Sequence, residues 1–355
     1  MPFTVTVQPS GKSFSVERDE PILLAAIRQG VGLPYGCKDG ACGSCKCRML
    51  EGRVIHGVHQ QKALSHEEEA AGFILTCQAA PQTDVVVEAR TVPGAGEFQV
   101  RKLPSRVLSI DKPAPDVAIL KLQLPANDPF KYRAGQFVEF ILRDGSRRSY
   151  SMANAPHTIA DTSAIELHVR HLPGGKFTDH VFGAMKEKDI LRVEGPFGSF
   201  FLREDTDKPM VLLASGTGLA PIKSIVEHMI HIGSQRKAVL YWGCRSKADL
   251  YAHDWAEAAV SRLPTLRYVP VLSEPKPDDG WTGRTGLVHQ AVLHDLPNLM
   301  EHQVYACGAP IMVESAQRDF VVRAGLPDDE FYADSFTSEA DKHGPGTIAT
   351  NVALS

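Results

Sequence analysis

Four cysteines in the first part of the chain have the spacing of a metal centre. Cys37, Cys42 and Cys45 follow the pattern C-x4-C-x2-C, and Cys77 supplies a distant fourth thiol. This is the plant-type ligand pattern for a [2Fe–2S] cluster, in which one loop provides three thiolates. Glycines within such a loop let its backbone pass close to the cluster sulfurs. The spacing therefore predicts that these four cysteines bind a [2Fe–2S] cluster.

A zinc site, or a group of thiols that merely pack, is the alternative for these residues. Structural zinc sites usually combine two C-x2–4-C pairs, and only half of this pattern fits that rule. Cys47 lies two residues after Cys45 on an expected strand. Its use as a ligand would break the cluster spacing, so we expect it to be a buried apolar residue.

A second group of reactive side chains lies where an expected strand ends. In the run RSYS, Arg148 can pair with a phosphate, Tyr150 can stack on a flat ring and Ser151 can reach a ring nitrogen. The run PGGKFT at 173–178 adds two glycines that free backbone amides, a lysine and a threonine. Such a turn at the start of a helix is a seat for an anion.

Three loops in the last third of the chain follow apolar strands. The first, Gly216-Thr217-Gly218, leads from MVLLA into a helix, and its glycines permit close approach of a pyrophosphate. The others are Trp242–Arg245 and Ala306–Pro310. In an open parallel sheet, ligands bind at the carboxyl ends of the strands, so the three loops predict a dinucleotide site. For Cys307, a small buried residue is the alternative interpretation.

The elements that must position these residues divide the chain into three domains. Residues 1–92 read as strands, one helix after Pro21 and a cysteine-rich loop, and a turn-rich linker follows at 93–101. Residues 102–204 contain many short strands, which favours an antiparallel barrel. Residues 205–340 alternate strands with helices, which favours a parallel sheet. We expect 341–355 to be a flexible tail.

Composition excludes several classes of protein. With 355 residues, 43% hydrophobic and 23% charged, the chain can bury real cores, which excludes disorder as its main state. A net charge of −4 argues against nucleic-acid binding. The sequence lacks an apolar run of about 18 residues and the features of a signal peptide. Seven cysteines, five of them in the first 77 residues, form a poor disulfide framework, so we expect a cytoplasmic protein.

The motifs together resemble two known families. CKDGACGSC with the later LTC resembles the plant-type ferredoxins. RSYSMAN, HVRHLPGGKFT, GPFG, GTGLAP, WGCR and ACGAP resemble the ferredoxin–NADP reductase superfamily over 102–340. Nearly the whole chain thus resembles a three-domain iron–sulfur flavoreductase of the type found as CDP-6-deoxy-3,4-glucoseen reductases and reductase components of ring-hydroxylating dioxygenases. The resemblance implies an α+β β-grasp ferredoxin domain, an antiparallel β-barrel flavin domain and an α/β parallel-sheet nucleotide domain.

The resemblance also implies roles for individual residues. Tyr150 would stack on the isoalloxazine of FAD and Ser151 would bond near flavin N5, with Cys307 as the third catalytic residue. Phe336, in the stretch FYADSF, would lie near the flavin, although the chain continues for nineteen residues beyond it; a terminal strand with one buried face is the alternative. The cofactor-binding residues expected in this way are Arg148, Tyr150, Ser151, His168, Val169, Arg170, Gly174, Gly175, Lys176, Thr178, Gly216, Thr217, Gly218, Arg245, Cys307, Gly308 and Phe336.

These cofactors imply an NADH-dependent electron-transfer reductase. NADH gives two electrons as a hydride, a [2Fe–2S] cluster accepts one at a time, and FAD converts between the two modes. The expected acceptor is a terminal oxygenase component, with a sugar dehydrase as the alternative. Arg245, Ser246 and Lys247 could instead hold the 2′-phosphate of NADPH. A redox-sensing module that binds a nucleotide is the alternative from another class of protein.

Overall fold

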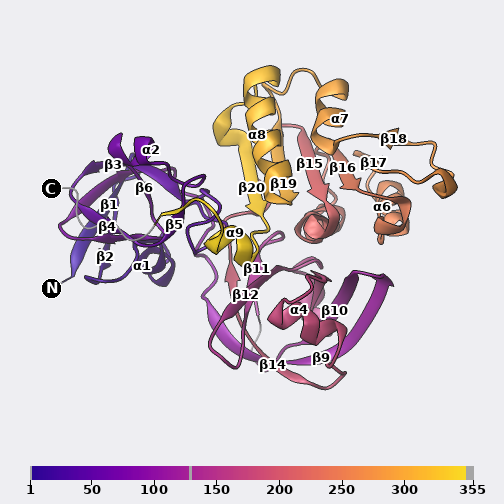
Figure 1. Cartoon of the computed structure of the whole chain (residues 1–355), viewed down its shortest axis with the longest axis horizontal. Helices are drawn as coiled ribbons and strands as arrows, with labels where there is room; N and C mark the ends of the chain where they lie inside the picture. Colours follow the sequence, from indigo (N-terminus) through magenta and orange to yellow (C-terminus); the bar gives the residue numbers. More distant parts are fainter. Residues whose placement is uncertain (1, 128–129, 349–355) are drawn as a thin grey trace. The chain divides into compact units, whose positions relative to one another are not determined.

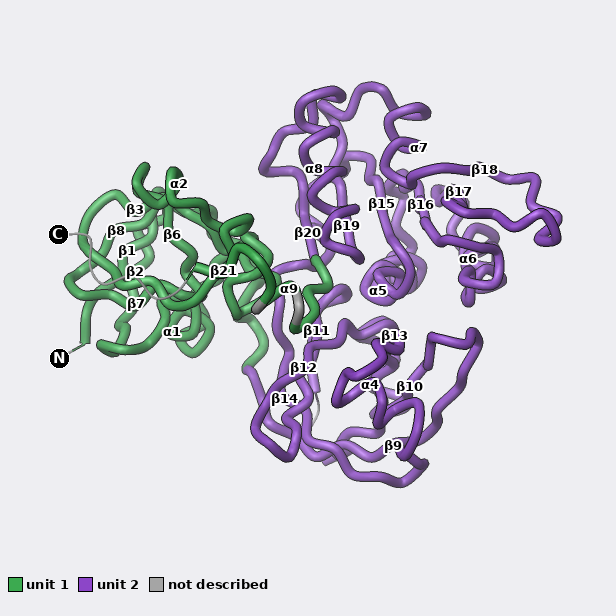
Figure 2. Tube along the Cα trace, in the orientation of Figure 1, with its two compact units in different colours: residues 1–99, 335–355 green, residues 100–334 purple. Residues whose placement is uncertain are grey.

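The computed structural model describes residues 2–127 and 130–348 (Figure 1). The chain forms two compact units, Met1–Gln99 with Ser335–Ser355, and Val100–Asp334 (Figure 2). Among the described residues, no helix is both long and apolar enough to cross a bilayer.

The first unit is built on a five-stranded mixed sheet in the order β2-β1-β8-β3-β6. Its strands are β2 (Lys12–Val16), β1 (Phe3–Gln8), β8 (Val85–Glu88), β3 (Lys46–Glu51) and β6 (Phe73–Leu75). β1 pairs antiparallel with β2 and parallel with β8. The alternating residues Val5, Val7, Phe14 and Val16 are buried, as the period of two predicts. The helix α1 (Ile22–Arg28) begins after Pro21 and buries Ile22, Leu23, Ala25 and Ala26, which completes the predicted β-grasp fold.

Two short ladders complete this unit. β4 (Val54–His56) pairs with β7 (Ala79–Pro81), and β5 (His59–Gln60) pairs with β21 (Thr347–Ile348). The short helix α2 (His66–Ala70) precedes β6.

The C-terminal residues differ from the expected flexible tail. Residues 341–348 belong to the helix α9 (Glu339–His343) and to β21, while residues 349–355 lie outside the described part of the chain. The hydroxyl of Ser338 accepts the backbone N–H of Asp341 and thereby caps α9. A two-residue strand has no periodicity, so its pairing with β5 leaves no local signal in the sequence.

The second unit starts with a six-stranded antiparallel sheet in the order β12-β11-β14-β9-β10-β13. Its strands are β12 (Arg147–Ser151), β11 (Phe137–Ile141), β14 (Ile190–Phe197), β9 (Arg101–Ala114), β10 (Val117–Gln123) and β13 (Ala164–Arg170). A bridge between Met152 and Leu167 joins the two edges of the sheet, which gives the predicted barrel. The helices α3 (Thr158–Thr162) and α4 (Lys176–Phe182) flank β13 in sequence.

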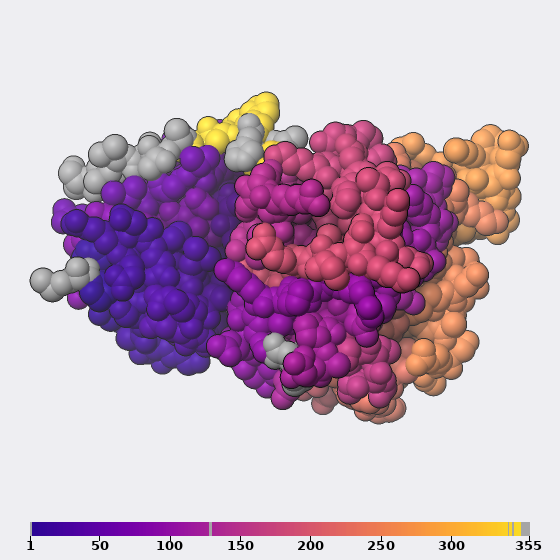
Figure 3. Space-filling view, turned by 90° about the horizontal axis from the view of Figure 1, so that it is seen from below, coloured from indigo at the N-terminus to yellow at the C-terminus, as the bar shows by residue number. Residues whose placement is uncertain are grey.

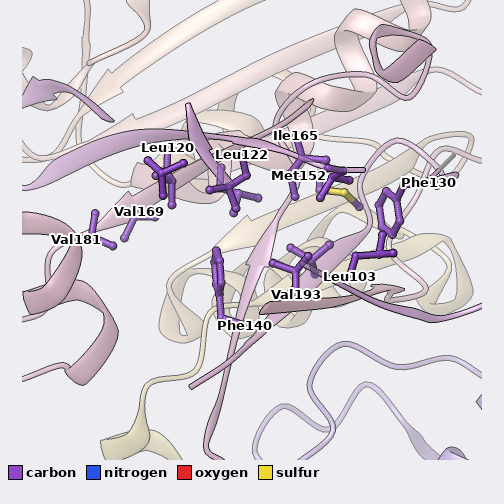
Figure 4. Close-up of a cluster of buried hydrophobic side chains, with 14 of the residues drawn as sticks. Leu103, Leu120, Leu122, Phe130, Phe140, Met152, Ile165, Val169, Val181 and Val193 are labelled. Atoms are coloured by element: carbon purple, nitrogen blue, oxygen red, sulfur yellow. The ribbon is translucent and has the colours of Figure 1, made fainter. Parts of the chain in front are cut away.

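The barrel is filled by apolar side chains from all of its strands (Figure 4). Figure 4 labels Leu103, Leu120, Leu122, Phe130, Phe140, Met152, Ile165, Val169, Val181 and Val193. This filled interior makes the barrel a rigid base, so ligands must bind at its rim and not within it.

The rest of the second unit is a parallel sheet in the order β18-β17-β16-β15-β19-β20. Its strands are β18 (Arg284–Thr285), β17 (Leu266–Leu272), β16 (Ala238–Cys244), β15 (Met210–Ser215), β19 (Gln303–Gly308) and β20 (Phe331–Ser335). Its helices are α5 (Leu219–His231), α6 (His253–Arg262), α7 (Val288–Asp295) and α8 (Pro310–Ala324), with 3-10 turns η1 (Gly216–Gly218), η2 (Lys247–Asp249), η3 (Pro277–Asp279) and η4 (Asp328–Glu330). β15 pairs in parallel with both β16 and β19. The three predicted loops therefore share one edge of the sheet, as expected.

Candidate functional site

The four predicted cluster cysteines lie together in two pairs of thiols. The backbone N–H of Cys37 donates to the sulfur of Cys42 across 3.4 Å, Cys42 raises the pKa of the Cys37 thiol, and Cys45 raises the pKa of the Cys77 thiol. Two irons that each take two thiolates fit two pairs. Among the described residues, no three His, Cys, Asp or Glu side chains gather as ligands for a single metal ion. The two pairs of thiols therefore fit the two irons of a binuclear cluster.

The loop that carries these thiols depends on glycine. Gly40 and Gly43 have φ of +76° and +77°, a region that other residues rarely adopt. A Cβ on Gly40 would lie 2.9 Å from the Cβ of His59, so β5 packs directly against the loop. The hydrogen bond from Cys37 lowers the pKa of the Cys42 thiol to about 6, although its burial acts in the opposite direction.

Cys47 lies outside this group of thiols. It is on β3, opposite Ile74 of β6, and is buried. Burial, with a smaller effect from Cys45, raises the pKa of Cys47 to about 12, so it stays a protonated thiol. This placement supports the expectation that it packs as an apolar residue.

A buried polar group joins the barrel to the parallel sheet. The hydroxyl of Ser151, at the end of β12, donates to Oδ2 of Asp334 on β20 across 3.1 Å. The thiol of Cys307, on β19, donates to the same oxygen across 3.9 Å. Burial, and then the Asp334 charge, raises the pKa of Cys307 well above its usual range, so the thiol keeps its proton. Ser151 and Cys307 were both predicted to be catalytic, and the structure brings them to one carboxylate.

Asp334 was not among the predicted site residues. It lies in the stretch FYADSF, in which only Phe336 was predicted to contact a cofactor. Its side chain is 7% exposed. The available signal was an acidic residue inside an otherwise apolar strand, because a buried carboxylate needs donors.

Tyr150 and Arg148 lie on the same strand as Ser151. Tyr150 is half-buried, and its ring packs against Phe177 and Phe140 with centroid distances of 5.2 and 5.8 Å. A guanidinium nitrogen of Arg148 donates to the carbonyl of Arg147 across 2.7 Å. Both side chains stand at the barrel rim, where stacking on a flavin ring and pairing with its phosphates remain predictions.

The glycine turn before α4 is largely held by its own side chains. The Thr178 hydroxyl donates to the Leu172 carbonyl across 2.9 Å. The Gly174 N–H donates to Asp179 across 3.1 Å, and Lys176 pairs with Asp144 at 2.6 Å. The turn starts a helix, as predicted, but a phosphate would have to compete with these acceptors. Gly175 is the N-cap residue of α4, and its role in binding FAD remains a prediction.

The predicted residues of β13 serve different purposes. The side chain of Val169 is part of the barrel core. The ring nitrogens of His168 hydrogen-bond Tyr251 at 2.7 Å and Glu166 at 3.1 Å, so both are already used within the protein. The side chains of His168 and Val169 therefore contact other protein groups, whereas the side chain of Arg170 extends toward Gly216 in the nucleotide loop. Contact of His168 and Val169 with a cofactor stays a prediction.

The loops after β15 and β19 pack directly against each other, and between them the Ser215 hydroxyl accepts the backbone N–H of Ala309 across 3.0 Å. A Cβ on Gly218 would lie 2.2 Å from the carbonyl oxygen of Cys307. A Cβ on Gly308, whose φ is +135°, would lie 2.2 Å from the hydroxyl oxygen of Ser215. Any side chain at either position would therefore force the two loops apart. Trp242 donates to the carbonyl of Gly216 across 2.9 Å and braces the first loop, where Thr217 is buried.

Two arginines lie beside this loop. Arg170 and Arg245 contact the same oxygen of Asp116 at 3.3 and 3.7 Å. A Cβ on Gly216 would lie 3.1 Å from a guanidinium nitrogen of Arg170. The Nε of Arg170 is buried and has no hydrogen-bond partner among the described residues. A guanidinium with an unused donor next to a glycine loop is suited to a pyrophosphate.

Phe336 follows β20 and is half-buried. It belongs to the unit that contains the cysteine loop. Its contact with the flavin therefore stays a prediction.

Three domain models match the chain in series. The description "2Fe-2S iron-sulfur cluster binding domain" covers residues 5–82, "Oxidoreductase FAD-binding domain" covers 105–202, and "Oxidoreductase NAD-binding domain" covers 212–318. The donor sets described above fit these three cofactors in the same order.

Similar proteins match over almost the full length. The CDP-6-deoxy-L-threo-D-glycero-4-hexulose-3-dehydrase reductase of Yersinia pseudotuberculosis is 40% identical over 95% of this chain and 99% of its own. Reductase component 1 of terephthalate 1,2-dioxygenase from Comamonas is 33% identical over 96% and 99%. The crystal structure of an Amycolatopsis cytochrome P450 reductase matches with a TM-score of 0.78 and 35% identity, over 95% of this chain and 99% of that one.

Proposed function

We propose that Ser151, Asp334 and Cys307 mark the point where hydride passes from NADH to FAD. The chain belongs to the three-domain reductases that combine a [2Fe–2S], an FAD and an NAD domain. It is an NAD(P)H-dependent iron–sulfur flavoprotein oxidoreductase. When bound, FAD supplies the conversion of a hydride into single electrons, and the [2Fe–2S] cluster carries those electrons onward.

The contact of Ser151 and Cys307 with Asp334 is the observation that carries this proposal. The three side chains come from the barrel and from the parallel sheet, and each is less than 10% exposed. A hydroxyl and a protonated thiol that share one carboxylate have fixed orientations. Fixed dipoles in a site that excludes water stabilise developing charge without reorganisation. Ser151, predicted to contact the flavin, and Cys307, predicted to lie beside the nicotinamide, both hydrogen-bond to Asp334.

NADH is the proposed donor. Arg245 is the residue that could hold the 2′-phosphate of NADPH, and Asp116 both pairs with it and would repel a phosphate. Arg170 also pairs with Asp116, but its Nε has no hydrogen-bond partner among the described residues, so Arg170 and the glycine loop after β15 are proposed to hold the pyrophosphate. We therefore assign the site to the nucleotide without the extra phosphate.

The proposed ligands of the cluster are Cys37, Cys42, Cys45 and Cys77. The proposed FAD ligands are Arg148, Tyr150, Ser151 and the turn from Gly174 to Thr178. The position of Arg148, Tyr150 and Ser151 on one strand supports the FAD assignment, and the loop that carries Cys37, Cys42 and Cys45, with Cys77 beside Cys45, supports the cluster assignment. All seven cysteines are free thiols, which supports a reducing, cytoplasmic location.

The proposed electron acceptor is a terminal oxygenase component. Similarity to a dioxygenase reductase component supports it. A sugar dehydrase is the second candidate, because the dehydrase reductase from Yersinia is 40% identical. The relatives reported above are reductases, so a redox sensor is disfavoured.

One reconstitution experiment tests the function. The purified protein, loaded with iron, sulfide and FAD, is mixed with NADH without oxygen, and its visible spectrum is followed. We expect bleaching of both flavin and iron–sulfur bands, then electron delivery to an oxygenase or a dehydrase component. A protein that binds zinc and no flavin, or whose bands do not respond to NADH, would contradict the proposal.

A further inference from the structure

The last described residues of the chain are attached to the loop that carries the cluster cysteines. We propose that Ser338–Ile348, here called the C-terminal strap, holds that loop in place and sets the reduction potential of its cluster through the charge of Lys342. This inference rests on the proposed cluster ligands, because its effect is exerted on the cluster itself. In Figure 2 the strap has the colour of the N-terminal unit, and in Figure 3 its described atoms are yellow and lie at the molecular surface.

The strap is bound to β5 by main-chain and side-chain contacts. Thr347 and Ile348 pair with Gln60 and His59, and the N–H of Gln61 donates to the carbonyl of Gly346 across 2.8 Å. Ile348 is 8% exposed. A strand pair with a buried apolar residue is an ordered attachment and not a loose tail.

Gln60 connects the strap to the cluster loop. Its side-chain amide donates to the carbonyl of Lys342 across 2.7 Å and to the hydroxyl of Thr347 across 2.8 Å. Its backbone N–H donates to the carbonyl of Gly40 across 3.0 Å. Gly40 lies between Cys37 and Cys42, so one buried residue holds the strap with its side chain and the loop with its backbone.

Lys342 brings a positive charge to the same loop. Its ammonium lies 2.5 Å from Oδ2 of Asp39, which is two residues after Cys37, and 3.2 Å from Glu339. The other carboxylate oxygen of Asp39 is buried and accepts no hydrogen bond from any residue that the structure describes. Burial would lower the pKa of Lys342, but Asp39 and Glu339 raise it overall, so the ammonium stays charged.

The charges at Asp39 and Lys342 affect the reduction potential of the cluster, because reduction adds one negative charge to the cluster. The reduction potential of an iron–sulfur cluster depends on the charges and hydrogen bonds around it. With Lys342 in place, the Asp39 charge is compensated. Without Lys342, an uncompensated carboxylate beside the loop disfavours the reduced cluster, and the potential falls.

Four variants of the full-length, cluster-loaded protein separate these charges. Lys342→Gln should shift the cluster midpoint potential down, and Asp39→Asn should shift it up. The double variant restores the net local charge of the wild type, in which Lys342 faces both Asp39 and Glu339, and should lie close to the wild type, as should Lys342→Arg. Lys12→Gln on β2 removes a lysine from the same unit and is the matched control. The potential is measured by an anaerobic redox titration that follows the cluster signal by electron paramagnetic resonance.

The outcomes also separate this inference from the proposed function. A wild-type protein that does not bind two irons per chain would contradict the cluster assignment itself. A normal cluster whose potential is the same in Lys342→Gln and Lys12→Gln would overturn the role of the strap. A chain that ends at Thr337 should release iron to a chelator severalfold faster than the full chain. Equal release rates would show that the strap does not hold the loop.

Discussion

The hydroxyl of Ser151 donates a hydrogen bond to the carboxylate of Asp334 across 3.1 Å, although 183 positions separate the two residues in the chain. Ser151 ends a strand of the antiparallel barrel, and Asp334 lies on the last strand of the parallel sheet. The Asp334 carboxylate of the parallel sheet therefore fixes the orientation of the Ser151 hydroxyl of the barrel. A change in either residue should therefore affect hydride transfer more than it affects folding.

The first prediction concerns this pair. Ser151→Ala and Asp334→Asn should each slow NADH-driven flavin reduction by roughly tenfold to a hundredfold, the range for loss of one preorganised polar contact at a reacting centre. Stopped-flow measurement of flavin bleaching gives the rate. Ser149→Ala removes an exposed hydroxyl from the same strand and should keep the wild-type rate. If all three variants reduce at equal rates, the pair has no part in the reaction.

The second prediction concerns the thiols. Cys77→Ser should abolish the iron–sulfur absorption and electron delivery to the partner, while NADH still reduces the flavin, since the loss is confined to one domain. Cys47→Ser should retain two irons per chain, because Cys47 lies on β3 as a buried, protonated thiol. Iron analysis and visible spectra measure both. Loss of iron in Cys47→Ser together with retention in Cys77→Ser would reverse the ligand assignment.

The sequence predicted those parts of the molecule whose signals are local. Cys37, Cys42 and Cys45 lie within nine residues, and Gly216–Gly218 joins a strand directly to a helix, so spacing alone indicated both sites. Contacts between distant segments have no such signal. Asp334 comes close to Ser151 because β20 is the edge strand of the parallel sheet and pairs with β19. Nothing in the local sequence indicates this pairing.

The motifs also did not predict the direction in which individual side chains point. In HVR the motif suggested three cofactor contacts, but alternation along β13 sends Val169 into the barrel core. Thr178 was expected to bind phosphate, yet its hydroxyl closes the turn onto Leu172. A threonine near a helix start serves its own backbone as readily as a ligand, so the phosphate contact of Thr178 stays a prediction.

The third prediction concerns the close approach of two loops. Gly218→Ala places a methyl group 2.2 Å from the Cys307 carbonyl, so the loop must shift. We expect a loss of about 1–3 kcal/mol in unfolding free energy and a raised KM for NADH. Gly233→Ala, where a Cβ meets open space at a φ of +62°, should cost only about 1 kcal/mol and leave KM unchanged. Thermal unfolding and steady-state kinetics test both, and equal KM values in the two variants would contradict a nucleotide role for this loop.

The fourth prediction concerns acid stability. Burial alone would raise the pKa of Glu166, but hydrogen bonds and charge from His168 and Lys223 lower it from 4.5 to about 2. Because the folded-state pKa is the lower one, the stabilisation is present above pH 4.5 and disappears as the pH falls toward 2. Its size is on the order of 3 kcal/mol. Urea unfolding between pH 7 and pH 3 should show a steeper loss of stability for the wild type than for Glu166→Gln. Parallel curves would mean that this carboxylate is not the group that titrates.

The last prediction concerns nucleotide choice. Asp116 holds Arg170 and Arg245 and presents negative charge where a 2′-phosphate would need a cation. Asp116→Asn should therefore raise kcat/KM for NADPH relative to NADH, because the guanidinium of Arg245 is released from its carboxylate partner. Asp111→Asn removes an exposed carboxylate from the same region of the barrel and should leave the ratio unchanged. Steady-state assays with both nucleotides give the two ratios. The double variant Asp116→Asn with Arg245→Ala should lose the gain, since Arg245 is the cation proposed to meet the 2′-phosphate. A gain that survives in the double variant would show that some other residue reads the 2′-position.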